Sequence, residues 1–213
     1  MLTLDATSSV AEAPASMDPR VTELHCIMPI ANLASVSAHG ILSYERAARL
    51  QHASVAMQPV QDRRDQKRVP QGLRLHQYAN LYFHARNPML YKRLGEAASI
   101  CVLRISLDAL ESQGAVITDS NAASDYARFL HPSQWRLINF DDVLAQSWTH
   151  PDDPRRYYQH KSRKCAEVLV PHRVPPELLT GAYVIDTATR DRLAAHLPHL
   201  PTIIDPVLFF RSN

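Results

Sequence analysis

The stretch "SICVLRISL", residues 99–107, is apolar at almost every position. Such a run is typical of a strand that is buried on both faces, near the middle of a sheet. The chain contains further runs with strand character, at residues 23–30, 80–85, 114–119, 165–171, 182–187 and 201–210. The first of these alternates, with Leu24, Cys26, Met28 and Ile30 on one face. The sequence therefore predicts a sheet that contains residues 99–107 as an inner strand.

The predicted helices are short. Residues 33–39 follow Asn32, a common N-cap residue, and precede Gly40, which suits the position after a helix end. Residues 44–50 follow Ser43, another good cap, and two later helices are expected at residues 140–148 and after Thr187. Many strands with few, short helices, most of them early in the chain, favour an α+β fold with a mixed or antiparallel sheet over a doubly wound fold.

The length of 213 residues fits one domain. Residues 1–20 are rich in Ala, Ser and Pro and predict a flexible tail, which leaves residues 21–213 as a single domain. Three cysteines far apart, without a Cys-x-x-Cys pair, predict a reduced, cytoplasmic compartment, and the histidines show no metal-binding spacing. We expect no signal peptide, no transmembrane segment and no metal.

Positive charge is concentrated between Gln61 and Arg93, where eight lysines and arginines stand against two aspartates, although the net charge of the chain is only +2. Such a segment is a candidate surface for a polyanion, and the alternative is a solvated loop with scattered charges. Much of it belongs to residues 51–77, a polar stretch without clear periodicity. We expect a long loop here, and long loops inside compact domains are usually functional or disordered.

Few residues are obvious candidates for chemistry. The chain has no glycine-rich phosphate-binding motif and no Gly-x-Ser-x-Gly. Cys26 and Cys101 lie in apolar runs, as buried thiols do, whereas Cys165 follows the cationic run "HKSRK" and is a minor candidate nucleophile.

Glu167 is the more informative residue, because it lies inside the apolar run "CAEVLVP". A carboxylate on a buried strand needs a partner or a task. The alternative is an exposed strand face, but alternation would then expose Leu169 together with Glu167.

Five fragments occur in order along the chain: "ANLASVSAHGILS" (31–43), "VQDRRDQKRVP" (60–70), "LHQYANLYFHARNPMLY" (75–91), "VITDSNAA" (116–123) and "CAEVLVP" (165–171). Together they resemble the DarT family, bacterial toxins that use NAD⁺ to ADP-ribosylate DNA bases. The resemblance covers roughly residues 24–171 and is most specific between residues 60 and 91. It implies an ADP-ribosyltransferase fold, with a split mixed sheet, short helices on its N-terminal side and NAD⁺ in its cleft. It also implies a macrodomain antitoxin as partner.

The resemblance implies a role for each matching residue. The family's catalytic arginine and glutamate fall on Arg64 and Glu167. Arg64 either positions Glu167 or contacts an NAD⁺ phosphate, and the two roles are compatible. The implied cofactor contacts are Cys26, Ile27, Met28, Asn32, Ser35, Ser43 and Arg64.

The sequence departs from the family pattern in two places. The family's first-strand histidine is replaced by Cys26, with His25 one position earlier, so that either residue is a candidate for that contact. The family's Pro-Phe and Pro-Arg-Ser-Pro pattern appears here as Asn80-Leu81 and as residues 85–88, "ARNP". The chain therefore resembles a variant branch.

The implied chemistry accounts for the cationic segment. Cleavage of the glycosidic bond of NAD⁺ passes through an oxocarbenium-like state, which a carboxylate stabilises. The acceptor base must be exposed, as it is in single-stranded DNA. The expected DNA contacts are Arg63, Lys67, Arg68 and Arg86, and Tyr78, Tyr82 or Tyr91 either stack on bases or pack in the core.

The sequence thus predicts an NAD⁺-dependent mono-ADP-ribosyltransferase that modifies a base of single-stranded DNA and acts as the toxin of a toxin–antitoxin system. Two alternatives stay open. The same fold would modify RNA or protein, or the protein would bind nucleic acid without catalysis, and then Glu167 would have no role.

Overall fold

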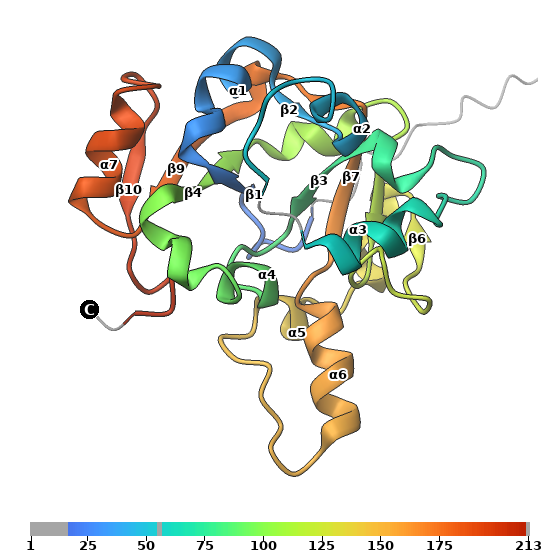
Figure 1. Ribbon diagram of the computed structural model, residues 1–213. Coiled ribbons are helices and arrows are strands. Elements are labelled where there is room, and N and C mark those ends of the chain that lie inside the picture. Colours follow the sequence, from blue (N-terminus) through green and yellow to red (C-terminus); the bar gives the residue numbers. More distant parts are fainter. Residues whose placement is uncertain (1–16, 55–56, 212–213) are drawn as a thin grey trace, which may run out of the picture.

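The computed structural model describes residues 17–54 and 57–211 (Figure 1). Its centre is an eight-stranded sheet with the order β10-β9-β4-β1-β3-β7-β5-β6. These strands are β1 Leu24–Pro29, β3 Tyr78–Tyr82, β4 Ile100–Ile105, β5 Val116–Thr118, β6 Phe129–Leu130, β7 Glu167–Pro171, β9 Leu179–Val184 and β10 Thr202–Ile204. Only β10 and β9 pair in parallel among these described strands, so the sheet is mixed and mostly antiparallel. A separate two-stranded sheet pairs β2 (Ile41–Leu42) with β8 (Arg173–Val174).

The helices are short and surround the sheet. The α-helices are α1 Leu33–His39, α2 Tyr44–Ala47, α3 Gln58–Asp65, α4 Pro88–Tyr91, α5 Phe140–Leu144, α6 Pro154–Arg163 and α7 Thr187–Ala194. The 3₁₀ turns are Ile30–Asn32, Leu75–Gln77, Leu94–Ser99, Leu107–Glu111, Pro132–Leu137 and Pro176–Leu178. In Figure 1, α7 lies beside β10 at one edge of the sheet, and α6 projects below the sheet.

The inner strand predicted from residues 99–107 is confirmed as β4, which lies between β9 and β1. Both faces of β4 are covered. Cys101, Leu103 and Ile105 belong to the main core, and Ile100 and Val102 belong to a second cluster on the opposite face. An inner strand without exposed face needs apolar residues at successive positions, which is why its sequence does not alternate.

The two faces of the sheet differ in what covers them. On the main face, strand residues pack against buried side chains of α1, α5 and α7, such as Leu33, Val143 and Leu193. On the opposite face the apolar clusters are smaller, and one of them is formed by Val69, Leu75, Tyr78, Ala122 and Leu169. Alternation in β7 therefore places Leu169 and Glu167 on this opposite face, as the sequence predicts.

The sheet is split at its middle. The strands β1 and β3 are neighbours but pair at a single position, His25 with Tyr82. By contrast, β1 pairs with β4 over six positions. Beyond His25 the strands β1 and β3 therefore diverge, and the wedge between them opens toward α1 and α3. The α+β class with a split, mixed sheet is confirmed.

Two segments differ from the expected structure. Residues 51–77 are not one long loop, because they contain α3 and a 3₁₀ turn. Residues 151–164, for which the sequence indicated only polar and basic character, contain α6, which is ten residues long. Few apolar residues mark either helix in the sequence. The helix α6 is capped by Asp153 and held by the ion pairs of Arg156 and Arg163, whereas α3 has no side-chain cap and buries Arg64 against Glu167.

The predicted caps are partly confirmed. The Ser43 hydroxyl accepts a hydrogen bond from the Arg46 amide and caps α2. Asn32 precedes α1 but its side chain makes no capping bond, and α7 is capped by Asp186 rather than by Thr187. Asp186 is the cap because its carboxylate accepts hydrogen bonds from both the amide and the hydroxyl of Thr189.

Most of the predicted N-terminal tail, residues 1–16, lies outside the described residues. Of the remaining four residues, Met17 packs against the main core and Arg20 pairs with Asp18 and Asp141. The chain is therefore already part of the domain at residue 17.

Glu23 joins three neighbouring strands on the opposite face of the sheet. Its carboxylate accepts hydrogen bonds from Arg104 Nε at 2.6 Å and Tyr183 Oη at 2.8 Å, and it lies 3.2 Å from His25 Nε2. Burial raises the pKa of Glu23, but the bonds from His25, Tyr183 and Arg104 outweigh it and lower the pKa to about 2.

We expect Glu23→Gln to lower the free energy of unfolding by about 2 kcal/mol near neutral pH. Because the folded-state pKa lies below the ordinary value of 4.5, the stabilisation is complete above that value and is lost as the pH falls toward 2. Urea unfolding of both proteins across this range measures the difference. A difference that stays constant with pH would show that the charge of Glu23 does not matter.

Candidate active site

A buried ion pair lies at the split of the sheet. Arg64 Nη1, from α3, donates to both carboxylate oxygens of Glu167, from β7, at 3.1 and 3.0 Å. Arg64 is 6% exposed and Glu167 is 1% exposed. At this depth each charge depends on the other, because an unpaired buried charge costs several kcal/mol. The structure therefore brings together the two residues expected to be catalytic.

The loop after β5 completes the environment of Glu167. The backbone amide of Ala122 donates to Glu167 Oε1 at 3.0 Å, and the Glu167 amide donates to Thr118 Oγ1 at 3.1 Å. The fragment "VITDSNAA" thus contributes two contacts that hold the glutamate on its strand. A backbone donor has no side-chain signature, so the sequence did not reveal this contact.

Two cavities meet at this ion pair. The smaller, about 170 Å³, lies at the wedge between β1 and β3, and Pro29, Ser35, Gly40, Tyr44 and Leu75 are among its lining residues. The larger, about 790 Å³, lies between α3, α4, α6 and residues 121–126, and includes Glu167 in its wall. The two cavities have five lining residues in common: Cys26, Ile27, Gln61, Arg64 and Asn80.

Most of the expected cofactor residues surround the smaller cavity. Its wall contains Cys26, Ile27, Met28, Asn32, Ser35 and Arg64. Ser43 does not line it, because its side chain is buried as the cap of α2. His25 lines neither cavity and faces Glu23 instead. The geometry therefore places Cys26, and not His25, at the wedge.

The side chain of Asn32 bonds to the backbone of Ala53 in the wall of the smaller cavity. Its amide donates to the carbonyl of Ala53 at 2.7 Å and accepts from the amide of Ala53 at 2.9 Å. Asn32 therefore holds residues 52–54, which also line this cavity. Tyr44, another lining residue, stacks on His76 with ring centroids 4.4 Å apart.

The four expected DNA contacts are distributed differently. Arg63 lines the larger cavity, and Lys67 forms an ion pair with Asp125 at 3.0 Å across its rim. Arg68 is exposed but lines neither cavity. Arg86 donates to the carbonyls of Val207 and Gln146 and stacks over Phe210, so the structure uses it to hold the C-terminal segment.

The tyrosines also separate into groups. Tyr78 is buried at the wall of the smaller cavity, and its hydroxyl accepts from the Leu73 amide. Tyr91 lines neither cavity and packs edge-to-face against Trp148 and Phe210. Tyr82 lines the larger cavity as the cross-strand neighbour of Glu167. The sequence did not identify Tyr126 and Tyr158, which line the larger cavity and are 93% and 68% exposed.

The three thiols are poor nucleophiles. Burial raises the pKa of Cys26 and of Cys165 to about 12 and raises that of Cys101 further. The cationic run before Cys165 does not overcome this, because Lys164 turns inward. The candidate nucleophile at Cys165 is therefore not supported.

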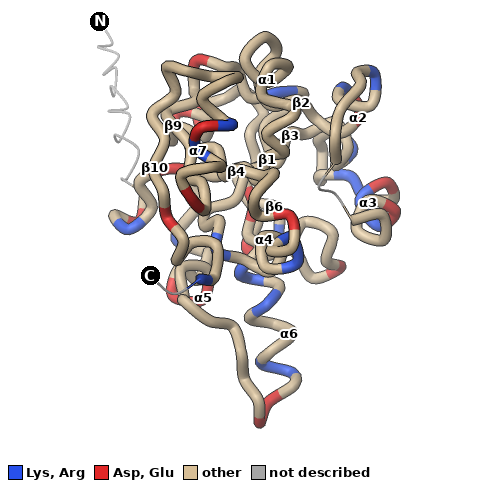
Figure 2. Tube along the Cα trace, turned by 60° about the vertical axis from the view of Figure 1, so that its left-hand side comes forward, with Lys and Arg blue, Asp and Glu red and all other residues tan. Residues whose placement is uncertain are grey.

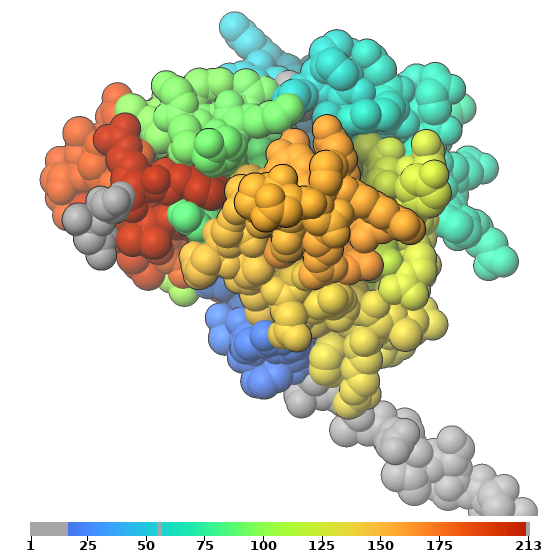
Figure 3. Space-filling model, turned by 90° about the horizontal axis from the view of Figure 1, so that it is seen from below, coloured from blue at the N-terminus to red at the C-terminus, as the bar shows by residue number. Residues whose placement is uncertain are grey.

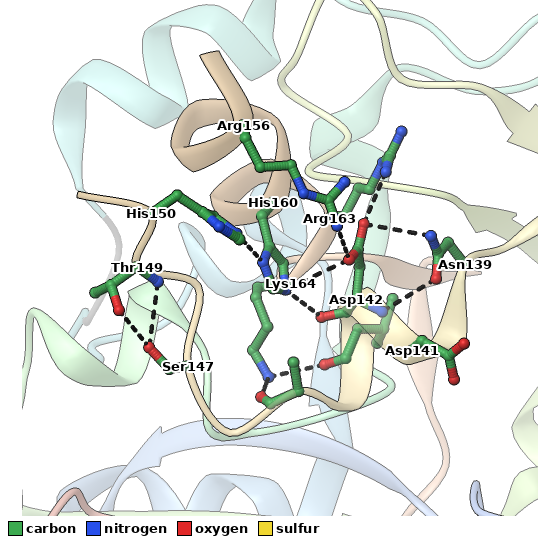
Figure 4. A network of polar contacts seen from close by, with 12 residues as sticks. Asn139, Asp141, Asp142, Ser147, Thr149, His150, Arg156, His160, Arg163 and Lys164 are labelled. Atoms are coloured by element: carbon green, nitrogen blue, oxygen red, sulfur yellow. Dashed lines mark hydrogen bonds and ion pairs between the residues drawn. The ribbon is translucent and has the colours of Figure 1, made fainter. Parts of the chain in front are cut away.

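A polar network anchors α6 and the start of β7 (Figure 4). The buried carboxylate of Asp142, in α5, pairs with Arg156 and Arg163 of α6, both at 2.7 Å, while the Asp142 carbonyl lies 2.9 Å from His160 Nε2. Just after α6, the fully buried Lys164 donates to the carbonyls of Val143 and Ala145 and lies 2.9 Å from His84 Nδ1.

Burial lowers the pKa of Lys164 to about 8. Burial and the neighbouring ammonium group lower the pKa of His84 to about 3, so that His84 stays neutral and accepts the bond. The network fixes the direction in which the chain enters β7, and thereby the position of Glu167 three residues after Lys164.

Within residues 17–54 and 57–211, no group of three or more His, Cys, Asp or Glu side chains lies close enough to hold a metal ion. No helix in the same part of the chain has the length and apolar character needed to cross a membrane.

Residues 25–210 match a family model described as "ssDNA thymidine ADP-ribosyltransferase, DarT". The chain belongs to the DarT family. The match extends the resemblance seen in the sequence fragments beyond residue 171, through α7 and β10. The expected family and the expected enzyme class, an ADP-ribosyltransferase, are confirmed.

Curated relatives are named as DNA ADP-ribosyl transferases. A DNA ADP-ribosyl transferase–DNA ADP-ribosyl glycohydrolase fusion protein of Thermosipho africanus is 30% identical over 211 residues, covering 92% of this chain. The chain spans about half of that protein, 52% of its length. A DNA ADP-ribosyl transferase of Thermus sp. 2.9 is 27% identical over 207 residues, covering 92% of this chain and 96% of the relative.

Solved structures of relatives confirm the fold. The Thermosipho africanus DarTG structure, in complex with ADP-ribose, has a TM-score of 0.78 at 27% identity and covers 90% of this chain and 52% of that one. The Thermus sp. 2.9 DarT structure with ADP-ribosylated single-stranded DNA has a TM-score of 0.78 at 24% identity, covering 91% and 98%. Another structure of the Thermus protein contains NAD⁺.

The neighbouring arginines Arg63 and Arg64 provide a test of the site. If they formed a simple phosphate-binding patch, their loss would have similar effects. Because Arg64 is buried against Glu167 and Arg63 is exposed, we expect Arg64→Ala to lower the rate of ADP-ribosyl transfer at saturating DNA by ~10²-fold or more. Arg63→Ala should cost about tenfold or less in DNA affinity.

Arg64→Lys is the matched variant, since it keeps the charge but replaces the guanidinium, whose Nη1 donates to both carboxylate oxygens, with an ammonium group on a differently shaped side chain that lacks the other guanidinium donors. We expect it to fail as Arg64→Ala does. Circular dichroism and thermal unfolding check that each variant is folded. Equal, mild losses of the transfer rate at saturating DNA in Arg63→Ala, Arg64→Ala and Arg64→Lys would contradict a catalytic role for Arg64.

Proposed function

We propose that this protein transfers the ADP-ribose group of NAD⁺ to a thymidine base of single-stranded DNA. The observation that carries the proposal is the Arg64–Glu167 pair at the junction of two cavities. One cavity is lined by all but one, Ser43, of the residues at which the family pattern implies cofactor contacts. The other is wide, carries cations and aromatic residues, and contains Glu167 in its wall. A donor and an acceptor in separate cavities would therefore meet at one carboxylate.

The transfer requires little from the protein besides position and charge. The bond between nicotinamide and C1′ of its ribose breaks, and nicotinamide leaves with the electron pair. A ring nitrogen of the base then bonds to C1′ and loses its proton. The carboxylate of Glu167 stabilises the positive charge on the ribose and receives that proton. Arg64 keeps the carboxylate in place between the two reactants.

The backbone of β1 supports binding of the nicotinamide end. From Cys26 onward β1 pairs with β4 but with no residue of β3, so those peptide groups of the segment 26–28 that point away from β4 are free to bond a carboxamide. This contact needs no particular side chain, which accounts for a Cys at the position where the family pattern has a His.

We further propose that the protein acts as the toxin of a toxin–antitoxin pair in the cytoplasm, with a macrodomain glycohydrolase as the antitoxin. The Thermosipho relative joins a transferase to a glycohydrolase in one chain, which supports such a pairing for this chain as well. An enzyme that removes ADP-ribose from DNA would reverse the product proposed here.

The direct experiment is incubation of the pure protein with NAD⁺ and a mixed-sequence single-stranded oligonucleotide, followed by mass spectrometry of the oligonucleotide. A gain of one ADP-ribose group on thymidine-containing strands supports the proposal. To separate the alternatives, label from radioactive NAD⁺ in a cell extract is treated with DNase, RNase or protease. Label that survives DNase but not RNase or protease would replace DNA with RNA or protein as substrate.

We expect Glu167→Ala and Glu167→Gln to bind NAD⁺ but to lose ADP-ribosyl transfer by at least ~10²-fold, because neither side chain carries the negative charge. Glu167→Gln keeps the shape of the side chain and can still accept from Arg64 and Ala122, so it separates loss of charge from loss of fold. Oligonucleotide mass and calorimetric NAD⁺ titration measure the two properties. Transfer by Glu167→Gln at a rate near the parent rate would contradict the assignment. Relief of toxicity on expression should accompany the loss.

We expect charge reversal at Lys67 and Arg68 to weaken DNA binding and to reduce its salt dependence, with little change in NAD⁺ affinity. Lys67 lies at the rim of the larger cavity, where reversal places a new acid beside Asp125. The control is Arg93→Glu, whose cation pairs with Glu96 outside both cavities. An equal loss of NAD⁺ affinity in the double variant would mean that residues 66–68 act on the cofactor instead.

A further inference from the structure

One face of α6 lines the larger cavity. Tyr158, Lys161 and Ser162 are spaced by three and four residues, so they lie on the same side of the helix and face the cavity together. The helix projects from the body of the protein and is anchored from its other side by Arg156 and Arg163 (Figure 1). The cavity-facing side is therefore not needed to hold the helix in place.

The ring of Tyr158 is held in a fixed place although most of its surface is exposed. It packs edge-to-face against Tyr157, with ring centroids 5.2 Å apart. Tyr157 is in turn fixed by Lys161, whose Nζ donates to its hydroxyl at 3.1 Å and lies 5.1 Å from its ring centre. Large exposed aromatic side chains that are held in this way lose little conformational entropy on binding a ligand.

A second exposed tyrosine belongs to the same cavity. Tyr126 lies in the loop that begins at Asn121, and the Asn121 amide donates to the carbonyl of Ser162 at 3.0 Å. The next residue, Ala122, donates to Glu167. Figure 3 shows α6 in orange at the front of this face, with the yellow-green segment that contains the loop beside it. Both tyrosines therefore stand on segments that are tied to the catalytic glutamate.

The lining of this cavity has the charge expected for a polyanion. Its cations are Arg63, Arg64, Lys92 and Lys161, and its acids are Asp125 and Glu167. Figure 2 shows the Lys and Arg positions along α6 in blue. Both acids are paired, Glu167 with Arg64 and Asp125 with Lys67. Arg63 and Lys92 are exposed and Lys161 is half-buried, so these three cations remain to attract phosphates, next to aromatic rings on which bases can stack.

We propose that the nucleotides next to the target base lie along α6, with one flanking base stacked on Tyr158 and its phosphate near Lys161. This inference rests on the proposed function, and it goes beyond it by naming where the rest of the strand is held. Stacking is tolerant of sequence, since every base has an aromatic face. The α6 contact then supplies affinity for single strands, while selection of the target base occurs beside Glu167.

The test combines protein variants with an abasic scan. Each oligonucleotide contains a single target thymidine, and an abasic site is placed at each flanking position in turn. The kcat/KM of ADP-ribosyl transfer to each strand is measured with the parent protein, Tyr158→Leu and Tyr158→Trp. We expect Tyr158→Leu to lower kcat/KM on the intact strand by about tenfold, and Tyr158→Trp to keep it. We expect one flanking position at which the abasic site costs the parent protein a similar factor and costs Tyr158→Leu almost nothing.

Two controls make the result specific. Arg155→Ala lies on the same helix, is exposed and lines neither cavity, so it should leave the abasic profile unchanged. Thermal unfolding checks that Tyr158→Leu is folded. Losses in Tyr158→Leu that are the same on every abasic strand, or no loss at all, would overturn the proposal.

Failure of the proposed function has a different signature. Fluorescence anisotropy measures binding of the same labelled strands without NAD⁺. Suppose that no ADP-ribosyl product forms, but that an abasic site at one flanking position weakens binding by the parent protein and not by Tyr158→Leu. The transferase proposal then fails, and the proposal that α6 binds the strand stands. If the product forms but every abasic site weakens binding equally in the parent protein and in Tyr158→Leu, only the α6 proposal fails.

Discussion

The buried ion pair between Arg64 and Glu167 is the constraint on which the rest of the structure depends. A carboxylate that is 1% exposed on a strand cannot remain charged without a partner, and Arg64 is the cation that reaches it. This requirement fixes the position of α3 over the sheet, because α3 must place one arginine at the split between β1 and β3. It also explains why the larger and the smaller cavity share a wall at this point.

Other parts of the fold serve the same position. The strands β1 and β3 pair only once, so the wedge beside Arg64 stays open. Ala122 holds one oxygen of Glu167, and Lys164 and the Asp142 network hold the chain just before β7. Groups fixed in this way do not need to reorganise during a reaction, which is the main source of electrostatic catalysis. The carboxylate is thus placed by contacts from α3, from the loop after β5 and from the α5–α6 region.

The sequence predicted those features that follow from a pattern of apolar residues. β4 was recognisable because both of its faces are buried, and the position of Glu167 followed from alternation with Leu169. The helices α3 and α6 were missed because charged and polar side chains cover them, so that no apolar stripe marks them. The contribution of Ala122 was invisible because a backbone amide bonds in the same way for any residue. Tyr158 was missed because its place in the cavity depends on the angle at which α6 leaves the domain. The resemblance to a family supplied Arg64, which no pattern within this chain singles out from Arg63.

The central claim is that Arg64 and Glu167 act as one unit at the junction of the cavities. The most direct test compares the transfer rates of Arg64→Ala, Glu167→Ala and the double variant on one single-stranded oligonucleotide at saturating NAD⁺. Residues that act as a unit are strongly non-additive, so the double variant should be no slower than the slower single variant. If instead the two losses multiply, the residues contribute independently, and the account of one ion-paired carboxylate that serves both cavities is wrong.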